Sequence, residues 1–129
     1  MFQFFRTRFK AIGYAIEGWW HVIRTQKNAW IHALISVGVI LAGYWLDLPR
    51  HNWAIIILTI AMVWMAEFLN TALEALIDLI SPDHNHLAKI SKDVGAAAVL
   101  IAAGASIVIG LLILGPPLWQ KILTLFQGQ

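Results

Sequence analysis

The sequence predicts an all-α membrane protein, with an N-terminal amphipathic surface helix followed by three transmembrane helices. Of its 129 residues, 60% are hydrophobic and only 12% are charged, and the mean hydropathy is +0.72. Soluble domains usually carry about a quarter charged residues, so this composition excludes an ordinary soluble fold. The absence of cysteine excludes disulfide bonds and thiolate metal sites. We expect a single membrane-embedded domain over residues 1–129.

The first element is expected over residues 1–28 as an amphipathic helix. Hydrophobic side chains recur there at three- and four-residue steps, with basic residues between them. Such a helix either packs on the core of its own protein or lies in the lipid headgroup layer with Trp19 and Trp20 at the interface. We favour the headgroup layer because the rest of the chain is apolar. The segment is not typical of a signal peptide, since no long apolar run precedes its basic residues.

Three apolar runs are long enough to cross a bilayer, which takes about 20 helical residues. They cover residues 29–48, 53–80 and 94–119. Pro49 marks the first connecting turn and Pro82 the second. We expect the pair Pro116-Pro117 to end the third helix, because proline cannot continue the backbone hydrogen-bond ladder. Small residues along this third helix permit close helix packing.

The basic residues predict an orientation in the membrane. With the N-terminus inside the cell, the inner side holds Arg6, Arg8, Lys10, Arg24, Lys27, Lys89 and Lys92, and the outer side holds Arg50 and Lys121. This bias favours a cytoplasmic N-terminus and a cytoplasmic loop between the second and third spans. The basic N-terminal segment suits an anionic membrane surface, and no interleaved aromatic and basic array indicates nucleic-acid binding.

A row of polar residues interrupts the second apolar run. Glu67, Asn70, Glu74 and Asp78 follow one another at three- and four-residue steps, so they share one face of a helix. Ionisable side chains in a membrane helix are costly and call for an explanation. Three remain open: hydrogen bonds to neighbouring helices, a proton or cation relay, or an enzyme site with metal ligands and a general base.

The loop that follows, residues 82–93, supplies more polar side chains. Lys92 is well placed to bind a phosphate beside acids that hold Mg²⁺, and Asp93 suits the start of the next helix. His84 and His86 indicate a metal pair only weakly, because two histidines in a loop are more often solvated. The chain contains no P-loop, dinucleotide fingerprint, H-E-x-x-H or G-x-S-x-G motif. Any nucleotide is therefore bound without a standard soluble nucleotide fold.

These residues resemble a known family, the prokaryotic diacylglycerol kinases and undecaprenol kinases. The resemblance rests on "E-x-x-N-T-A-x-E-x-x-x-D" over residues 67–78 and "L-A-K-x-x-K-D" over residues 87–93. The runs "FKAIGYAIEG", "N-A-W-I-H" and "G-A-A-A-V-L-I" are similar to other parts of the family, so the likeness covers nearly the whole chain.

The resemblance implies a homotrimeric lipid kinase with a surface helix and three transmembrane helices. Such a protein transfers the γ-phosphate of ATP to a lipid alcohol with Mg²⁺, at a cytoplasmic active site of the bacterial inner membrane. Position by position, Glu67 matches the catalytic base, Asn70 an active-site polar residue and Glu74 a metal ligand. Lys92 and Asp93 match contacts to phosphate and nucleotide. Further nucleotide-contacting positions match Tyr14, Asp83, His84 and Asn85.

The sequence departs from the family pattern in two places. Gln26 stands where the family usually has a second metal-binding glutamate, and its amide oxygen can still contact Mg²⁺ but brings no charge. In the loop, His84 and Asn85 replace residues that are often Tyr and His, which puts this part of the nucleotide contact in question.

Two lipid alcohols are plausible acceptors. The "N-A-W-I-H" and "L-A-K-x-x-K-D" runs look more like the Gram-positive type, which favours phosphorylation of undecaprenol to undecaprenyl phosphate. Conversion of diacylglycerol to phosphatidic acid is the alternative. A non-catalytic transporter or structural subunit of the membrane is the alternative of another class.

Overall fold

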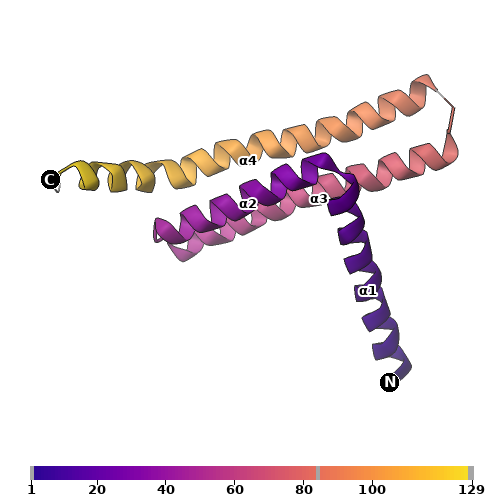
Figure 1. Ribbon diagram of the computed structural model, residues 1–129, viewed down its shortest axis with the longest axis horizontal. Coiled ribbons are helices and arrows are strands. Elements are labelled where there is room, and N and C mark those ends of the chain that lie inside the picture. The colour runs from indigo at the N-terminus through magenta and orange to yellow at the C-terminus, as the bar shows by residue number, and fades with distance from the viewer. Residues whose placement is uncertain (1, 84, 128–129) are drawn as a thin grey trace.

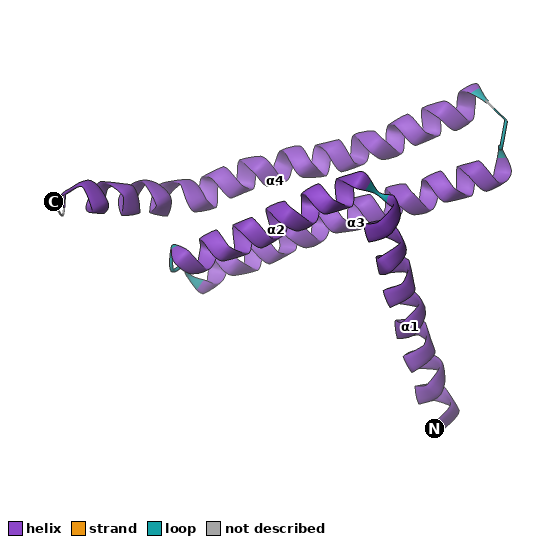
Figure 2. Ribbon diagram, in the orientation of Figure 1, coloured by secondary structure: helices purple, strands orange, loops and turns teal. Residues whose placement is uncertain are grey.

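The structure is a computed structural model that describes residues 2–83 and 85–127, without the side chains of the first few residues. Across the described residues the chain forms four helices and no strand, as Figures 1 and 2 show. They are α1 (Phe2–Thr25), α2 (Lys27–Trp45), α3 (Arg50–Ile80) and α4 (His86–Gln127). The prediction of an all-helical protein is confirmed.

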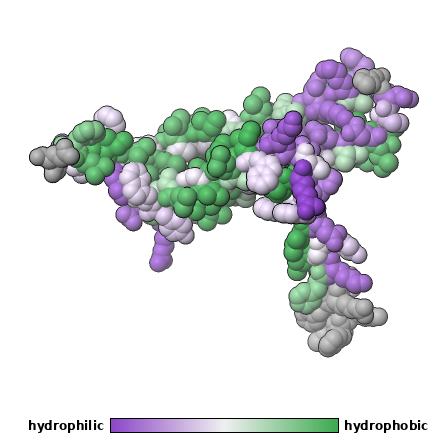
Figure 3. Space-filling view, viewed as in Figure 1, coloured by the Kyte–Doolittle hydropathy of each residue, from purple (hydrophilic) through white to green (hydrophobic). Residues whose placement is uncertain are grey.

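The three helices α2, α3 and α4 are long and apolar enough to cross a membrane, which confirms three candidate spans by length and composition. They run side by side, and α1 leaves this bundle at a steep angle (Figure 1). In Figure 3 hydrophobic side chains cover the middle of the bundle, and hydrophilic side chains gather around the turn between α3 and α4. The placement of α1 at the membrane surface stays a prediction.

The turn between α2 and α3 ends the first span at Trp45, three residues before the predicted end at Leu48. The Leu48 N–H donates to the Gly43 carbonyl and the Asp47 N–H to the Tyr44 carbonyl, both at 3.2 Å, which is the Schellman pattern of helix termination. Asp47 takes a positive φ of 52°, a conformation that aspartate tolerates better than most residues. Pro49 follows as the residue that caps α3.

Helices α1 and α2 are separated by one extended residue, Gln26, with φ −99° and ψ 116°. The break lies slightly before the boundary expected at residue 28. Around it Val22, Ile23 and Ala29 are buried, and Trp64 and Phe68 of α3 pack against them. The Trp19 ring stacks on the Trp64 ring, with centroids 5.4 Å apart. This aromatic cluster joins three helices at one level of the bundle.

Helix α4 corrects one prediction, because it continues through Pro116 and Pro117 to Gln127. Proline at these positions removes N–H donors to the preceding turn, but its fixed φ is itself compatible with a helix. The residue before Pro116 is Gly115, which has no Cβ to meet the proline ring. Helix α4 also begins at His86, several residues before the apolar run. The predicted bounds of 94–119 therefore describe its apolar part only.

A second core cluster lies at the end of the bundle opposite the α3–α4 turn. It consists of Leu46, Leu48, Ile56 and Ile113, with Trp53 packed against it. Many other large apolar side chains are exposed, for example Leu100 and Leu112 on α4 at 73% and 71%. Faces of this kind suit contact with lipid chains or with further copies of the protein.

Candidate active site

Glu67 is the most deeply buried large side chain among the described residues, with 1% of its surface exposed. It lies on α3 between Trp64 and Phe68, which pack against the α1–α2 junction. The Thr71 hydroxyl one turn later is also buried and donates to the Glu67 backbone carbonyl at 2.9 Å. A carboxylate is seldom fully buried without a partner, so this position marks a candidate reaction centre.

The imidazole of His32 on α2 faces this carboxylate. His32 Nε2 lies 3.8 Å from Glu67 Oε2, and the side chains are 13% and 2% exposed. Neither atom has a hydrogen-bond partner among the described residues. Sequence reasoning did not assign His32 a role, although a histidine inside a predicted apolar span was a signal that could have identified it.

Asn70 and Glu74 continue the polar face of α3. Asn70 Nδ2 donates a hydrogen bond to Glu74 Oε1 at 3.0 Å. Asn70 Oδ1 is buried, has no hydrogen-bond partner among the described residues and faces Gly95 on α4, where an ideal Cβ would lie only 2.4 Å from that oxygen. The two helices can approach this closely because residue 95 has no side chain.

The exposure of this face increases toward the α3–α4 turn. Glu67 is buried, Asn70 and Glu74 are half-buried, and Asp78 is exposed. Lys92 Nζ on α4 donates to Asp78 Oδ1, so an ion pair joins the two helices where the face reaches solvent. Lys89 and Asp93 form a second, exposed pair at 2.6 Å along α4.

A pocket of about 560 Å³ lies at this turn between α3 and α4. It brings together most of the residues that the sequence nominates for nucleotide and phosphate contacts: Asp83, Asn85, Lys92 and Asp93, with Asp78 beside them. The pocket therefore combines basic and acidic groups at the end of the bundle that carries the polar surface in Figure 3.

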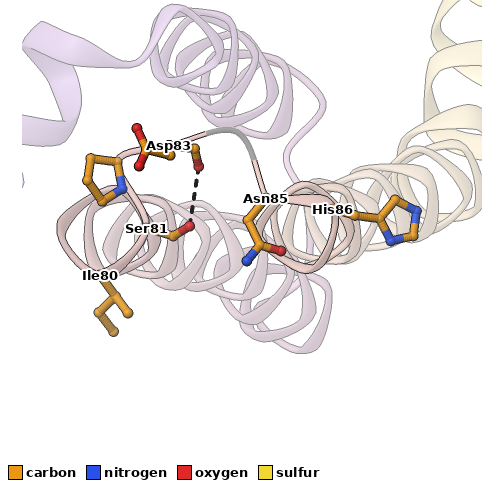
Figure 4. A pocket seen from close by; sticks show the side chains of 6 residues that line it. Ile80, Ser81, Asp83, Asn85 and His86 are labelled. Carbon is orange, nitrogen blue, oxygen red and sulfur yellow. Dashed lines mark hydrogen bonds between the residues drawn. The ribbon is translucent and has the colours of Figure 1, made fainter.

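The turn itself is held by local hydrogen bonds, part of which Figure 4 shows. The Ser81 hydroxyl donates to the Asp83 backbone carbonyl at 3.3 Å. Asn85 Oδ1 accepts from the Leu87 N–H at 2.8 Å, so Asn85 caps the first turn of α4. In Figure 4 His86 projects away from Ser81 and Asp83. His84 lies outside the described residues.

Two nominated residues lie away from this pocket. Tyr14 is 68% exposed on α1, the helix that projects from the bundle. Gln26 is half-buried at the α1–α2 junction, and its side chain makes no capping hydrogen bond to α2. Within residues 2–83 and 85–127, no group of three or more His, Asp or Glu side chains gathers as a ready-made metal site.

A groove of about 360 Å³ opens on the other side of the polar face, between α1 and α3. Trp19 and Val22 of α1 and Phe68 and Thr71 of α3 are among the side chains that line it. It borders the same stretch of α3 that carries Glu67 and Asn70. An apolar groove and a polar pocket thus lie toward opposite ends of one row of functional groups.

Comparison with known proteins identifies relatives over most of the chain. Residues 13–114 match the family described as "Prokaryotic diacylglycerol kinase". An undecaprenol kinase of Bacillus subtilis is 41% identical over 110 residues, which cover 85% of this chain and 89% of the relative. A diacylglycerol kinase of Synechocystis is 42% identical over 81% of this chain and 61% of its own length. A diacylglycerol kinase of Escherichia coli is 35% identical over 72% and 76%.

Proposed function

The chain belongs to the prokaryotic diacylglycerol kinase family and is a lipid kinase, and from this premise we propose that it transfers the γ-phosphate of ATP to undecaprenol. The relative that this chain covers almost completely is an undecaprenol kinase. Diacylglycerol is the alternative acceptor, because relatives of similar identity are diacylglycerol kinases. The product would be undecaprenyl phosphate, or phosphatidic acid in the alternative.

The observation that carries the proposed chemistry is the graded polar face of α3. Glu67 is buried, and the face leads through the Asn70–Glu74 hydrogen bond to the pocket that contains Lys92. Phosphoryl transfer requires mainly that the reactants be positioned and that charge be neutralised. A buried base for a lipid hydroxyl and a pocket with Lys92 at its wall for a triphosphate meet these two requirements at the two ends of one face.

Glu67 is proposed as the general base. A base must lie within reach of the hydroxyl whose proton it takes. Glu74 follows Glu67 by seven residue steps, about 10 Å along the helix, which separates the acceptor end from the nucleotide end. The lipid alcohol would reach Glu67 from the membrane, and its oxygen would attack the γ-phosphorus as Glu67 accepts the proton.

The residues near Glu74 fit Mg²⁺ that arrives with the nucleotide. Mg²⁺ prefers oxygen ligands and is usually held by one or two carboxylates together with substrate phosphates. One Glu74 oxygen accepts from Asn70, which orients the carboxylate. Glu74 would therefore hold the ion, with the Gln26 amide oxygen as a second candidate ligand. When bound, Mg²⁺ supplies positive charge to the triphosphate.

The remaining nucleotide contacts follow the pocket at the α3–α4 turn. Lys92 carries a positive charge at its wall, and its present partner is the exposed Asp78. An exposed ion pair contributes little stability, so Lys92 can exchange it for a phosphate at small cost. Asp83, Asn85 and Asp93 line the same pocket and are proposed to contact the nucleotide. Tyr14 lies on α1, away from this pocket, and it would contact the nucleotide only where the nucleotide extends toward that helix.

We further propose a homotrimer in the bacterial inner membrane, with the N-terminus and the pocket on the cytoplasmic side. The excess of Lys and Arg at that side supports the orientation. The exposed apolar faces of α4 leave room for contacts between copies. A mass measurement in mild detergent that gives a monomer or dimer would contradict the trimer.

One assay tests the function. Purified protein in detergent and lipid receives labelled ATP and Mg²⁺ with undecaprenol, with diacylglycerol, or with no added lipid. Label is expected in undecaprenol at the higher rate, and the Glu67→Gln variant, which keeps the size of the side chain, is expected to be inactive. Label in neither lipid would refute the kinase proposal. A faster reaction with diacylglycerol would reassign the acceptor.

A further inference from the structure

His32 and Glu67 form a buried pair that the roles assigned above do not use. The distance of 3.8 Å between Nε2 and Oε2 is too long for a hydrogen bond but is short enough for one small side-chain rotation or one bridging water to connect them. Both atoms are without partners among the described residues, and buried polar atoms of this kind are costly unless a ligand or a reaction uses them. The residues come from different helices, so the fold brings them together.

The position of the imidazole is set by aromatic packing. The His32 ring meets the Trp64 ring edge-on, with centroids 6.4 Å apart and an interplanar angle of 66°. Trp64 is itself held, because its Nε1 donates to Ser36 Oγ on α2 at 3.3 Å and its ring stacks on Trp19 of α1. The imidazole is thus supported from two other helices and presented to Glu67.

We propose that His32 is a positioning residue for Glu67. His32 orients the Glu67 carboxylate toward the acceptor hydroxyl, and it then receives the proton that Glu67 has taken from that hydroxyl. This inference rests on the proposed role of Glu67 as the base. A base that keeps its proton cannot serve a second turnover, and the burial of Glu67 restricts direct return of the proton to water. The His32 side chain, at 13% exposure, is the less buried of the two.

The proton balance of the step is complete. The O–H bond of the lipid alcohol breaks, its oxygen forms a bond to the γ-phosphorus, and ADP leaves with the electron pair of the broken P–O bond. The proton passes to a carboxylate oxygen of Glu67 and then to Nε2 of His32. The imidazolium loses a proton to water, which restores both residues for the next turnover. Histidine suits this task because its imidazole ring can both accept and release a proton.

Two substitutions separate proton transfer from packing. His32→Gln keeps a side chain of similar reach with an amide that can donate to Glu67, but the amide cannot accept a proton. His32→Ala leaves a cavity of imidazole size beside Glu67, into which free imidazole can be added. His51→Ala is the matched control, because His51 is an exposed histidine at the far end of α3.

The expected result is a loss of turnover with intact nucleotide binding. General base catalysis contributes about 10²–10⁴-fold, so disabling its proton acceptor should lower kcat by at least about tenfold in His32→Gln. The KM for ATP should stay within about twofold of that of the unchanged protein. Added imidazole should restore a substantial part of kcat in His32→Ala, but none in Glu67→Gln. His51→Ala should match the unchanged protein.

Failure of the proposed His32 role can be told apart from failure of the proposed kinase activity, because the unchanged protein and Glu67→Gln are assayed in the same series. If the unchanged protein transfers label, a His32→Gln variant with undiminished kcat overturns the proton-transfer role. Loss of kcat in His32→Ala that imidazole does not restore, in a protein that unfolds at the normal temperature, also overturns it. If His32→Ala does not fold, the kcat of His32→Gln decides the question.

Discussion

The orientation of the Glu74 carboxylate on α3 is expected to depend on the absence of a side chain at Gly95 on α4. An alanine at this position would place its Cβ 2.4 Å from Asn70 Oδ1 and 3.2 Å from Leu73 Cδ2. An ordinary van der Waals contact for a Cβ begins at 3.4 Å, so the Asn70 amide must move by about 1 Å or α4 must separate from α3. Either movement disturbs the 3.0 Å hydrogen bond that Asn70 donates to Glu74.

The effect of Gly95→Ala on stability depends on the cost of overpacking and on the gain from replacing a helical glycine, and its effect on activity depends on the Asn70–Glu74 hydrogen bond. Overpacking costs about 1–3 kcal/mol, whereas replacing a helical glycine by alanine returns up to about 1 kcal/mol. Stability should therefore fall by no more than about 3 kcal/mol, and the protein should still fold. A hydrogen bond to a charged group contributes about 1.5–3 kcal/mol. Its loss should therefore raise the Mg²⁺ concentration at half-maximal rate by roughly tenfold or more.

The assay is the initial rate of Gly95→Ala as a function of Mg²⁺ concentration, together with its thermal unfolding in detergent. Gly104→Ala is the matched control on the same helix, because a Cβ there meets nothing within 4 Å. In an Asn70→Ala background the stability cost of Gly95→Ala should be much smaller, since the clashing amide is gone and only the closer approach to Leu73 is left. An unchanged Mg²⁺ dependence in Gly95→Ala would refute the reasoning, and so would an equal stability cost in both backgrounds.

Two further predictions concern the nucleotide end of the site. Lys92→Met should raise the KM for ATP about tenfold because the pocket loses its phosphate-binding charge, whereas Lys121→Met, which removes a charge beside Trp45 at the opposite end of the bundle, should change it less than threefold. Rates measured at varied ATP test this, and equal effects of the two substitutions would contradict it. Gln26→Glu should lower the Mg²⁺ concentration at half-maximal rate severalfold by adding a negative charge, and an unchanged Mg²⁺ titration would remove Gln26 from the metal site.

The helices and the polar face could be predicted from local patterns. Three- and four-residue spacing places Glu67, Asn70 and Glu74 on one side of a helix whatever surrounds it. The connecting turns were marked by Pro49 and Pro82 for the same local reason. The end of the third helix was predicted wrongly at Pro116-Pro117, because proline is compatible with a helix once the loss of its hydrogen bonds is tolerated.

The partners of that face could not be predicted in the same way. His32 and Glu67 are far apart in the chain, and no helical period relates them. The reason for a glycine at residue 95 is the α3 side chain that lies against it, and that contact exists only when α3 and α4 are packed together. Likewise Lys92 could be nominated for phosphate binding, but its pairing with Asp78 required the turn between the helices to be in place.

The sequence by itself determined that this chain is a helical membrane protein with a row of acids on one helix, and it carried the motifs of a lipid kinase family. Periodicity and composition are properties of neighbouring residues, so they can be read without a fold. The tertiary structure decided that Glu67 is buried opposite His32 and that Asn70 fits against Gly95. Those contacts depend on how close two helices approach, and that distance is set by packing across the whole bundle.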